Sequence, residues 1–161
     1  MTAQTTLPVP MNDLQLQYER IKSEIDAALA ETIANTSFIL GPQVAAFESA
    51  FADYNDVHHC VGVSNGTDAL KLALGACGVG PGDEVITTSH TFGATVEAVC
   101  DVGARPVFVD IEEDCFTIDV SLIAAAVTAA TKAIIPVHLF GQCAELDPLW
   151  RLAVRANLAI K

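Results

Sequence analysis

The sequence has few basic residues: 8 lysines and arginines stand against 20 aspartates and glutamates, giving a net charge of −12. Nucleic acids and anionic membrane surfaces bind proteins through basic side chains. The shortage therefore argues against both kinds of partner. There is also no apolar run of about 18 residues, the length of a membrane-spanning helix, and no basic N-terminal segment followed by an apolar one. We expect a cytoplasmic protein without a membrane or nucleic-acid partner.

The sequence lacks closely spaced cysteine pairs, and no histidine lies at metal-ligand spacing from a cysteine. The five cysteines are scattered in apolar surroundings: Cys60, Cys77, Cys100, Cys115 and Cys143. Isolated cysteines of this kind are typical of a reducing compartment and of small core positions. The sequence predicts neither a metal site nor a nucleophilic cysteine.

A chain of 161 residues with 52% hydrophobic content can bury the core of one domain. From Val57 onward, short apolar runs alternate with alanine-rich helical stretches, which predicts an α/β fold with a mostly parallel sheet flanked by helices. The expected strands are 60–63, 84–88, 106–110 and 133–137. The expected helices are 14–34, 43–54, 67–76, 94–102, 120–129 and 146–156.

We divide the chain into an N-terminal helical segment, 1–56, and an α/β part, 57–161. The last residues, 158–161, read as the opening of another buried strand, with no turn or polar tail after them. A sheet that stopped there would expose an unpaired edge. We therefore expect the sequence to be the N-terminal part of a longer protein.

A short polar turn lies in the segment 64–70, Ser-Asn-Gly-Thr-Asp-Ala-Leu, between an apolar run and a helical stretch. At such a turn, backbone N–H groups and the positive end of the helix dipole converge and can bind a phosphate. Gly66 permits close approach of the backbone, and Thr67 adds a hydroxyl donor. From these residues alone a second reading stays open, in which Ser64 and Asn65 only cap the helix.

Two glycine patterns suggest a dinucleotide site, but neither has the required context. The pyrophosphate motif follows a strand and opens a helix, whereas the glycines at 78, 80 and 82 precede an expected strand. The other pattern, Gly62 and Gly66, lacks a third glycine and an acidic residue at the end of the next strand. A nicotinamide dehydrogenase therefore remains only an alternative hypothesis.

Five motifs occur in the same order as in the DegT/DnrJ/StrS family of sugar-nucleotide aminotransferases, and the sequence resembles that family through them. They are the segments 64–70, 80–86, 89–92, 106–111 and 135–142. The upstream segments 38–42 and 47–48 also resemble the family, so the resemblance covers nearly the whole chain from about Met11. It implies the N-terminal part of the large domain of a fold-type I transferase that uses pyridoxal 5'-phosphate.

The resemblance implies roles for four residues. The family's cofactor phosphate rests on the backbone of the turn that matches Gly66, Thr67 and Asp68. An aromatic ring at the position of Phe92 stacks on the pyridine ring in the family. On the sequence alone Phe92 reads as a core aromatic at a strand end, and the resemblance reverses that reading. Neither His90 nor His138 is assigned a catalytic role.

In the family, the lysine that binds the cofactor covalently and the aspartate that keeps its pyridine nitrogen protonated lie beyond the position matching Lys161. The lysines present read as surface or helix-face residues: Lys22, Lys71, Lys132 and Lys161. We therefore expect no catalytic residue in this chain and no transamination by the chain alone.

The resemblance implies an aminotransferase that moves an amino group, typically from glutamate, onto a keto group of a nucleotide-linked sugar. The products would serve polysaccharide, lipopolysaccharide or antibiotic-sugar biosynthesis, and the full-length enzyme would be a homodimer. Arg20 and Lys22 are the cationic residues of the N-terminal segment that could contact the nucleotide. Two other hypotheses remain: a dehydratase of the same family, with a histidine in place of the lysine, and a non-catalytic remnant of a truncated gene.

Overall fold

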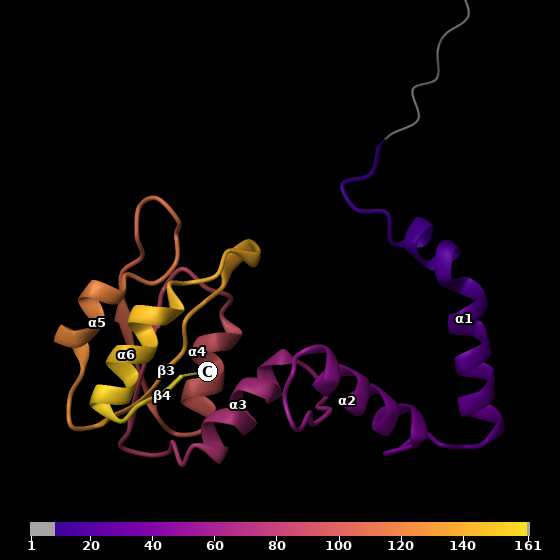
Figure 1. The fold of residues 1–161 in the computed structure, drawn as a ribbon, viewed down its shortest axis with the longest axis horizontal. Helices are drawn as coiled ribbons and strands as arrows, with labels where there is room; N and C mark the ends of the chain where they lie inside the picture. The colour runs from indigo at the N-terminus through magenta and orange to yellow at the C-terminus, as the bar shows by residue number, and fades with distance from the viewer. Residues whose placement is uncertain (1–8, 161) are drawn as a thin grey trace, which may run out of the picture. The chain divides into compact units, whose positions relative to one another are not determined.

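The computed structural model describes residues 9–160, which form two compact units that divide between Gly62 and Val63 (Figure 1). The first unit contains two helices, α1 (Leu14–Ala34) and α2 (Pro42–Tyr54). Asp13 caps α1 by accepting a hydrogen bond from the backbone N–H of Leu16 at 2.9 Å. No residue of α1 is buried.

A glycine and a proline determine where α2 begins. Gly41 precedes the helix, and Pro42 occupies its first position, where the missing N–H costs no hydrogen bond. A Cβ atom at Gly41 would lie 2.6 Å from the backbone oxygen of Ser37, which is too close for any other residue. The 38–42 segment therefore needs this glycine for its backbone path.

The second unit is built on a four-stranded parallel sheet with the order β2-β1-β3-β4. Because parallel neighbours need a crossover connection, helices join the strands. The strands are β1 (Glu84–Thr88), β2 (Arg105–Val109), β3 (Thr131–Ile134) and β4 (Ala159–Ile160). The helices are α3 (Gly66–Ala76), α4 (Ala94–Asp101), α5 (Val120–Ala126), the 3-10 turn η1 (Leu139–Gly141) and α6 (Leu146–Ala156).

Both faces of this sheet are covered by apolar side chains. Successive residues of a strand point to opposite faces, so Val85 and Ile86 of β1 enter different cores, and both are fully buried. On one face Ile86 packs with residues of α5 and α6, including Ile123 and Leu149. On the other face Val85 packs with residues of α3 and α4, including Leu74. The central strand is therefore buried on both sides, as expected for a parallel sheet.

A buried carboxylate links neighbouring segments at the end of the sheet where β1 begins. Glu84 is only 5% exposed, and it accepts hydrogen bonds from the hydroxyls of Thr128 at 2.7 Å and Thr131 at 3.4 Å. It also pairs with Arg105, the first residue of β2. The Thr128 hydrogen bond, followed by the Arg105 charge, holds the pKa of Glu84 below its ordinary value despite its burial. This network joins three neighbouring segments of the sheet.

The structure confirms the predicted parallel α/β fold, and three predicted elements, 14–34, 84–88 and 146–156, have the predicted bounds. The predicted strand 60–63 is wrong. The backbone N–H of Gly62 donates to the Glu48 side chain at 2.7 Å instead of to a neighbouring strand, and Val61 is 76% exposed. A strand exists only through pairing with another, and no described strand pairs with this segment.

Within residues 9–160, no helix combines the length and the apolar composition that crossing a membrane requires.

Candidate cofactor-phosphate site

The turn at the start of α3 is organised by its cap, Asn65. The extended backbone of Asn65 leads into the helix, and its side-chain oxygen accepts a hydrogen bond from the backbone N–H of Asp68 at 2.9 Å. Its backbone oxygen accepts from the N–H of Ala69 at 3.1 Å. Two of the N–H groups in the first turn are therefore already paired within the protein.

The N–H groups of Gly66 and Thr67, in contrast to those of Asp68 and Ala69, are unpaired in the described residues. Neither donates to an acceptor in residues 9–160, and the Thr67 hydroxyl is likewise without a hydrogen bond there. A Cβ atom added to Gly66 would meet nothing within 4 Å, so this side of the turn is open. Unpaired N–H groups at a helix N-terminus carry partial positive charge. Two backbone donors and one hydroxyl can therefore bind an anion here.

Asp68 lies in the same turn, but its carboxylate faces its own chain. The side chain accepts hydrogen bonds from the Ser64 hydroxyl and from the Asn65 amide nitrogen, the latter at 3.2 Å. Its N–H is occupied by Asn65, as described above. Of the three residues that the sequence assigns to the phosphate, Gly66 and Thr67 thus have unpaired N–H donors, whereas Asp68 does not. Ser64 and Asn65 are expected from the sequence only to cap the helix, although the spacing of Asn65 and Asp68 is that of a capping box.

Phe92 lies in the loop between β1 and α4 and is 80% exposed. Its backbone oxygen accepts from the N–H of Thr95 at 3.0 Å. The hydroxyls of Thr91 and Thr95 are hydrogen bonded at 2.8 Å, which ties the loop to the first turn of α4. The alternative that Phe92 is a core aromatic does not hold in this structure, because the ring is open to solvent.

No described hydrogen bond or ion pair joins the Phe92 loop to the α3 turn. The two are connected through the helices that follow them. Lys71 of α3 forms an ion pair with Asp101 of α4 at 2.9 Å, and Leu74 shares a core with Val99. The structure thus places the two parts of the predicted site at the starts of two adjoining helices.

Both histidines of the predicted site region are exposed. His138 accepts a hydrogen bond from the backbone N–H of Ala144 at its Nδ1, 3.1 Å away, and so closes the loop that contains η1. The contact gives His138 a structural partner in the backbone. His90 lies beside Phe116, with ring centroids 6.3 Å apart, a neighbour that the sequence analysis did not identify.

Two of the described lysines, Lys22 and Lys71, form ion pairs with aspartates. The hydrogen bond and charge of Asp101 raise the pKa of Lys71 above its ordinary value, which disfavours the neutral amine that a nucleophile requires. Lys22 pairs with Asp26, so its charge is already partly neutralised in the first unit. Lys132 is exposed on β3. None of these contacts resembles an activated lysine.

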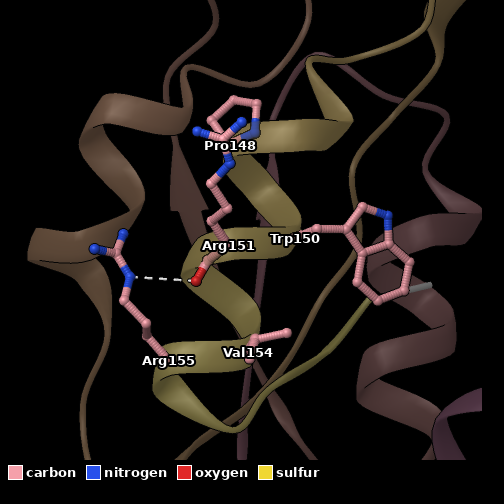
Figure 2. Close-up of a pocket in the computed structure, with 5 residues that line it drawn as sticks. All are labelled: Pro148, Trp150, Arg151, Val154 and Arg155. Carbon is pink, nitrogen blue, oxygen red and sulfur yellow. Dashed lines mark hydrogen bonds between the residues drawn. The ribbon is translucent and has the colours of Figure 1, made fainter.

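A surface hollow, away from the α3 turn, lies on the outer side of α6 (Figure 2). Figure 2 shows Trp150 and Val154 on one side of the helix, and Arg151 and Arg155 on the other. The Arg155 Nε donates to the backbone oxygen of Arg151 at 3.2 Å. The hollow is lined by residues of this one helix, on the sheet face opposite α3. It is therefore separate from the α3 turn.

The profile of the DegT/DnrJ/EryC1/StrS aminotransferase family matches residues 19–161. The dTDP-3-amino-3,4,6-trideoxy-alpha-D-glucose transaminase of Micromonospora megalomicea subsp. nigra is 49% identical over 145 residues, which are 90% of this chain and 39% of that protein.

Two solved structures are similar as well. The crystal structure of S. venezuelae DesV in complex with a ketimine intermediate superposes with a TM-score of 0.94 at 46% identity, covering 96% of this chain and 42% of that one. NtdA from Bacillus subtilis, solved with its cofactor PMP bound, gives a TM-score of 0.92 at 32% identity, covering 99% of this chain and 37% of that one. The chain thus spans about two fifths of the length of these relatives.

Proposed function

Because the chain belongs to the DegT/DnrJ/EryC1/StrS aminotransferase family, whose members are pyridoxal phosphate enzymes, we propose that it supplies the phosphate-binding part of a nucleotide-sugar aminotransferase. The similarity to a dTDP-sugar transaminase supports the substrate class. The single observation that carries the assignment is the family match over residues 19–161.

The residues of the α3 turn fit the cofactor's phosphate. Gly66 and Thr67 each offer an N–H without a protein acceptor, the Thr67 hydroxyl is unpaired in the described residues, and the space beside Gly66 is open. Charge-assisted hydrogen bonds from such donors are stronger than those between neutral groups. We infer that Gly66 and Thr67 hold the phosphate and that the helix dipole of α3 adds to its binding.

Phe92 is the residue of this chain that would cover the pyridine ring. Its side chain is exposed on a loop fixed by the Thr91–Thr95 hydrogen bond, so stacking needs little reordering of the backbone. A flat aromatic contact limits tilting of the ring and excludes water from one face. When bound, the cofactor supplies the electron sink that lets an amino group pass from a donor amino acid to a keto sugar.

We further propose glutamate as the amino donor, a homodimer as the working assembly and the cytoplasm as its location. The described lysines support the view that this chain does not transaminate by itself, because the pKa of Lys71 is raised and Lys22 is paired with Asp26. Covalent attachment of the cofactor would then need a lysine other than Lys22 and Lys71. The division of the chain into an N-terminal helical segment, 1–56, and an α/β part, 57–161, also remains a proposal.

The test uses the complete gene product. Purified protein is incubated with pyridoxal phosphate, a dTDP-linked keto sugar and ¹⁵N-glutamate, and the sugar is analysed by mass spectrometry. The expected product carries ¹⁵N in place of the keto oxygen. A sugar that loses water without gaining nitrogen would contradict the transferase proposal and indicate the dehydratase. An unchanged sugar together with no binding of pyridoxal phosphate would contradict the cofactor assignment.

A further inference from the structure

Asp68 lies in the first turn of α3, but its carboxylate forms its hydrogen bonds with neighbouring residues of the same turn. One carboxylate oxygen, Oδ2, accepts from both the Ser64 hydroxyl and the Asn65 side-chain amide, and both of these residues precede the helix. Its N–H donates to the Asn65 side chain at 2.9 Å. Asp68 and Asn65 therefore bind each other reciprocally, with Ser64 as the third member. This set is called the Ser64–Asn65–Asp68 triangle below.

The triangle encloses the two residues with unpaired donors. Gly66 and Thr67 lie between Asn65 and Asp68 in the chain, so fixing the two flanking residues limits the directions in which the intervening N–H groups can point. Preorganised donors need no reordering when an anion binds. Without the triangle, Gly66 would leave the turn free to adopt many backbone conformations.

The charge of Asp68 argues against direct contact with the phosphate. A carboxylate and a phosphate repel each other, and the repulsion grows as they approach. The observed contacts turn the carboxylate toward two donors of its own chain. An uncharged acceptor of the same shape could make the same two contacts, so the hydrogen bonds rather than the charge are the useful property.

We propose that Asp68 is a positioning residue for the cofactor phosphate: its carboxylate holds the Ser64–Asn65–Asp68 triangle and thereby aims the N–H groups of Gly66 and Thr67, without touching the phosphate itself. The inference rests on the proposed function, because the family match carries the phosphate site. It changes the role that the sequence resemblance implies for Asp68 from ligand to organiser.

The experiment compares pyridoxal phosphate with pyridoxal, which has no phosphate. The complete gene product is stripped of cofactor and titrated with each compound, and both Kd values are measured by absorbance. The ratio Kd(pyridoxal)/Kd(pyridoxal phosphate) then reports the contribution of the phosphate alone. A ratio near one in the unmodified protein would overturn the proposed function, whatever the variants do.

Asp68→Ala removes the triangle's acceptor, and we expect the ratio to fall about tenfold, the effect of weakening one or two hydrogen bonds to a charged group. Asp68→Asn keeps an acceptor and removes a repulsive charge, so its ratio should equal or exceed that of the unmodified protein. An unchanged ratio in Asp68→Ala would overturn the positioning role, even if the protein's Tm fell. An equal loss in Asp68→Asn would overturn it too, because the charge would then be required.

Two further variants keep the test informative. Ser64→Ala removes one exposed hydroxyl of the triangle and should lower the ratio by about threefold, with the fold retained by circular dichroism. Asp119→Ala is the matched control, since Asp119 caps α5 by accepting from the N–H and hydroxyl of Ser121 at 2.9 and 2.6 Å. It should lower Tm without changing the ratio. A fall in the ratio with Asp119→Ala would overturn the inference, because any lost helix cap would then have that effect.

Discussion

The two units of the chain use apolar residues in opposite ways. In the second unit Ile86, Ile134 and Leu149 are completely buried, and the central strand has packed side chains on both faces. In the first unit α1 carries an apolar stripe whose members are 39% to 65% exposed. The stripe consists of Leu14, Tyr18, Ile21, Ile25, Leu29 and Ile33.

The difference shows that amphipathic spacing predicts a helix without predicting a core. The α1 stripe recurs every three or four residues, the same pattern as in the helices that cover the sheet. Within the second unit, α3 and α4 cover one face of the sheet, and α5 and α6 cover the other. Stability from apolar burial should therefore be concentrated in the second unit, which the following substitutions test.

Truncation of the sheet core should have the largest effect. Ile86→Ala removes most of a fully buried side chain of β1, and we expect the free energy of unfolding to fall by about 2 to 5 kcal/mol through lost burial and the cavity left behind. Urea denaturation followed by circular dichroism measures the change. The control is Val154→Ala on α6, 75% exposed, which should change stability by less than about 0.5 kcal/mol. Similar losses for the two variants would contradict the assignment of the core.

The buried network at the start of β1 should make stability depend on pH. The pKa of Glu84 is lowered in the folded protein from an ordinary value of 4.5, so the charged form favours folding. This contribution is present above the unfolded pKa and is lost as the pH falls through the lower, folded pKa. Glu84→Gln should therefore lower Tm at neutral pH, and the loss should shrink in acid. A Tm difference that does not vary with pH would show that the charge of Glu84 is unimportant.

The helix caps allow a closer comparison of the two units. Asn65→Ala removes the cap of α3, a helix packed into the second unit, and should cost about 1 kcal/mol of stability. Asp13→Ala removes the corresponding cap of α1, which buries no residue. We expect that variant to reduce helix content with little change in the main unfolding transition. Equal shifts of that transition would mean that the two units unfold together.

The smallest effect is expected on the α1 stripe. Ile25→Gln replaces a 40% exposed apolar side chain with a polar one, and the free energy of unfolding should change by less than about 0.5 kcal/mol. The measurement is again urea denaturation, at two protein concentrations. A loss above about 1 kcal/mol, or a dependence on concentration, would show that the stripe is covered in solution.

Much of the fold could be predicted from the sequence because its signals are local. The bounds of β1 and α6 follow from apolar runs and from the turn residues beside them, and the capping residues Asp13 and Asn65 precede their helices by one position. The predicted strand 60–63 failed because an apolar run says nothing about whether a partner strand exists. In the structure Gly62 bonds to Glu48 instead.

The candidate site divides in the same way. The sequence by itself determined that residues 64–70 form a helix start with the composition of a phosphate-binding turn, since Asn, Gly and Thr act there through their own backbone and short side chains. Only the tertiary structure decided which donors stay unpaired and that Phe92 is exposed. These properties depend on which atoms come into contact in the folded protein, and neither residue type nor spacing along the chain specifies those contacts.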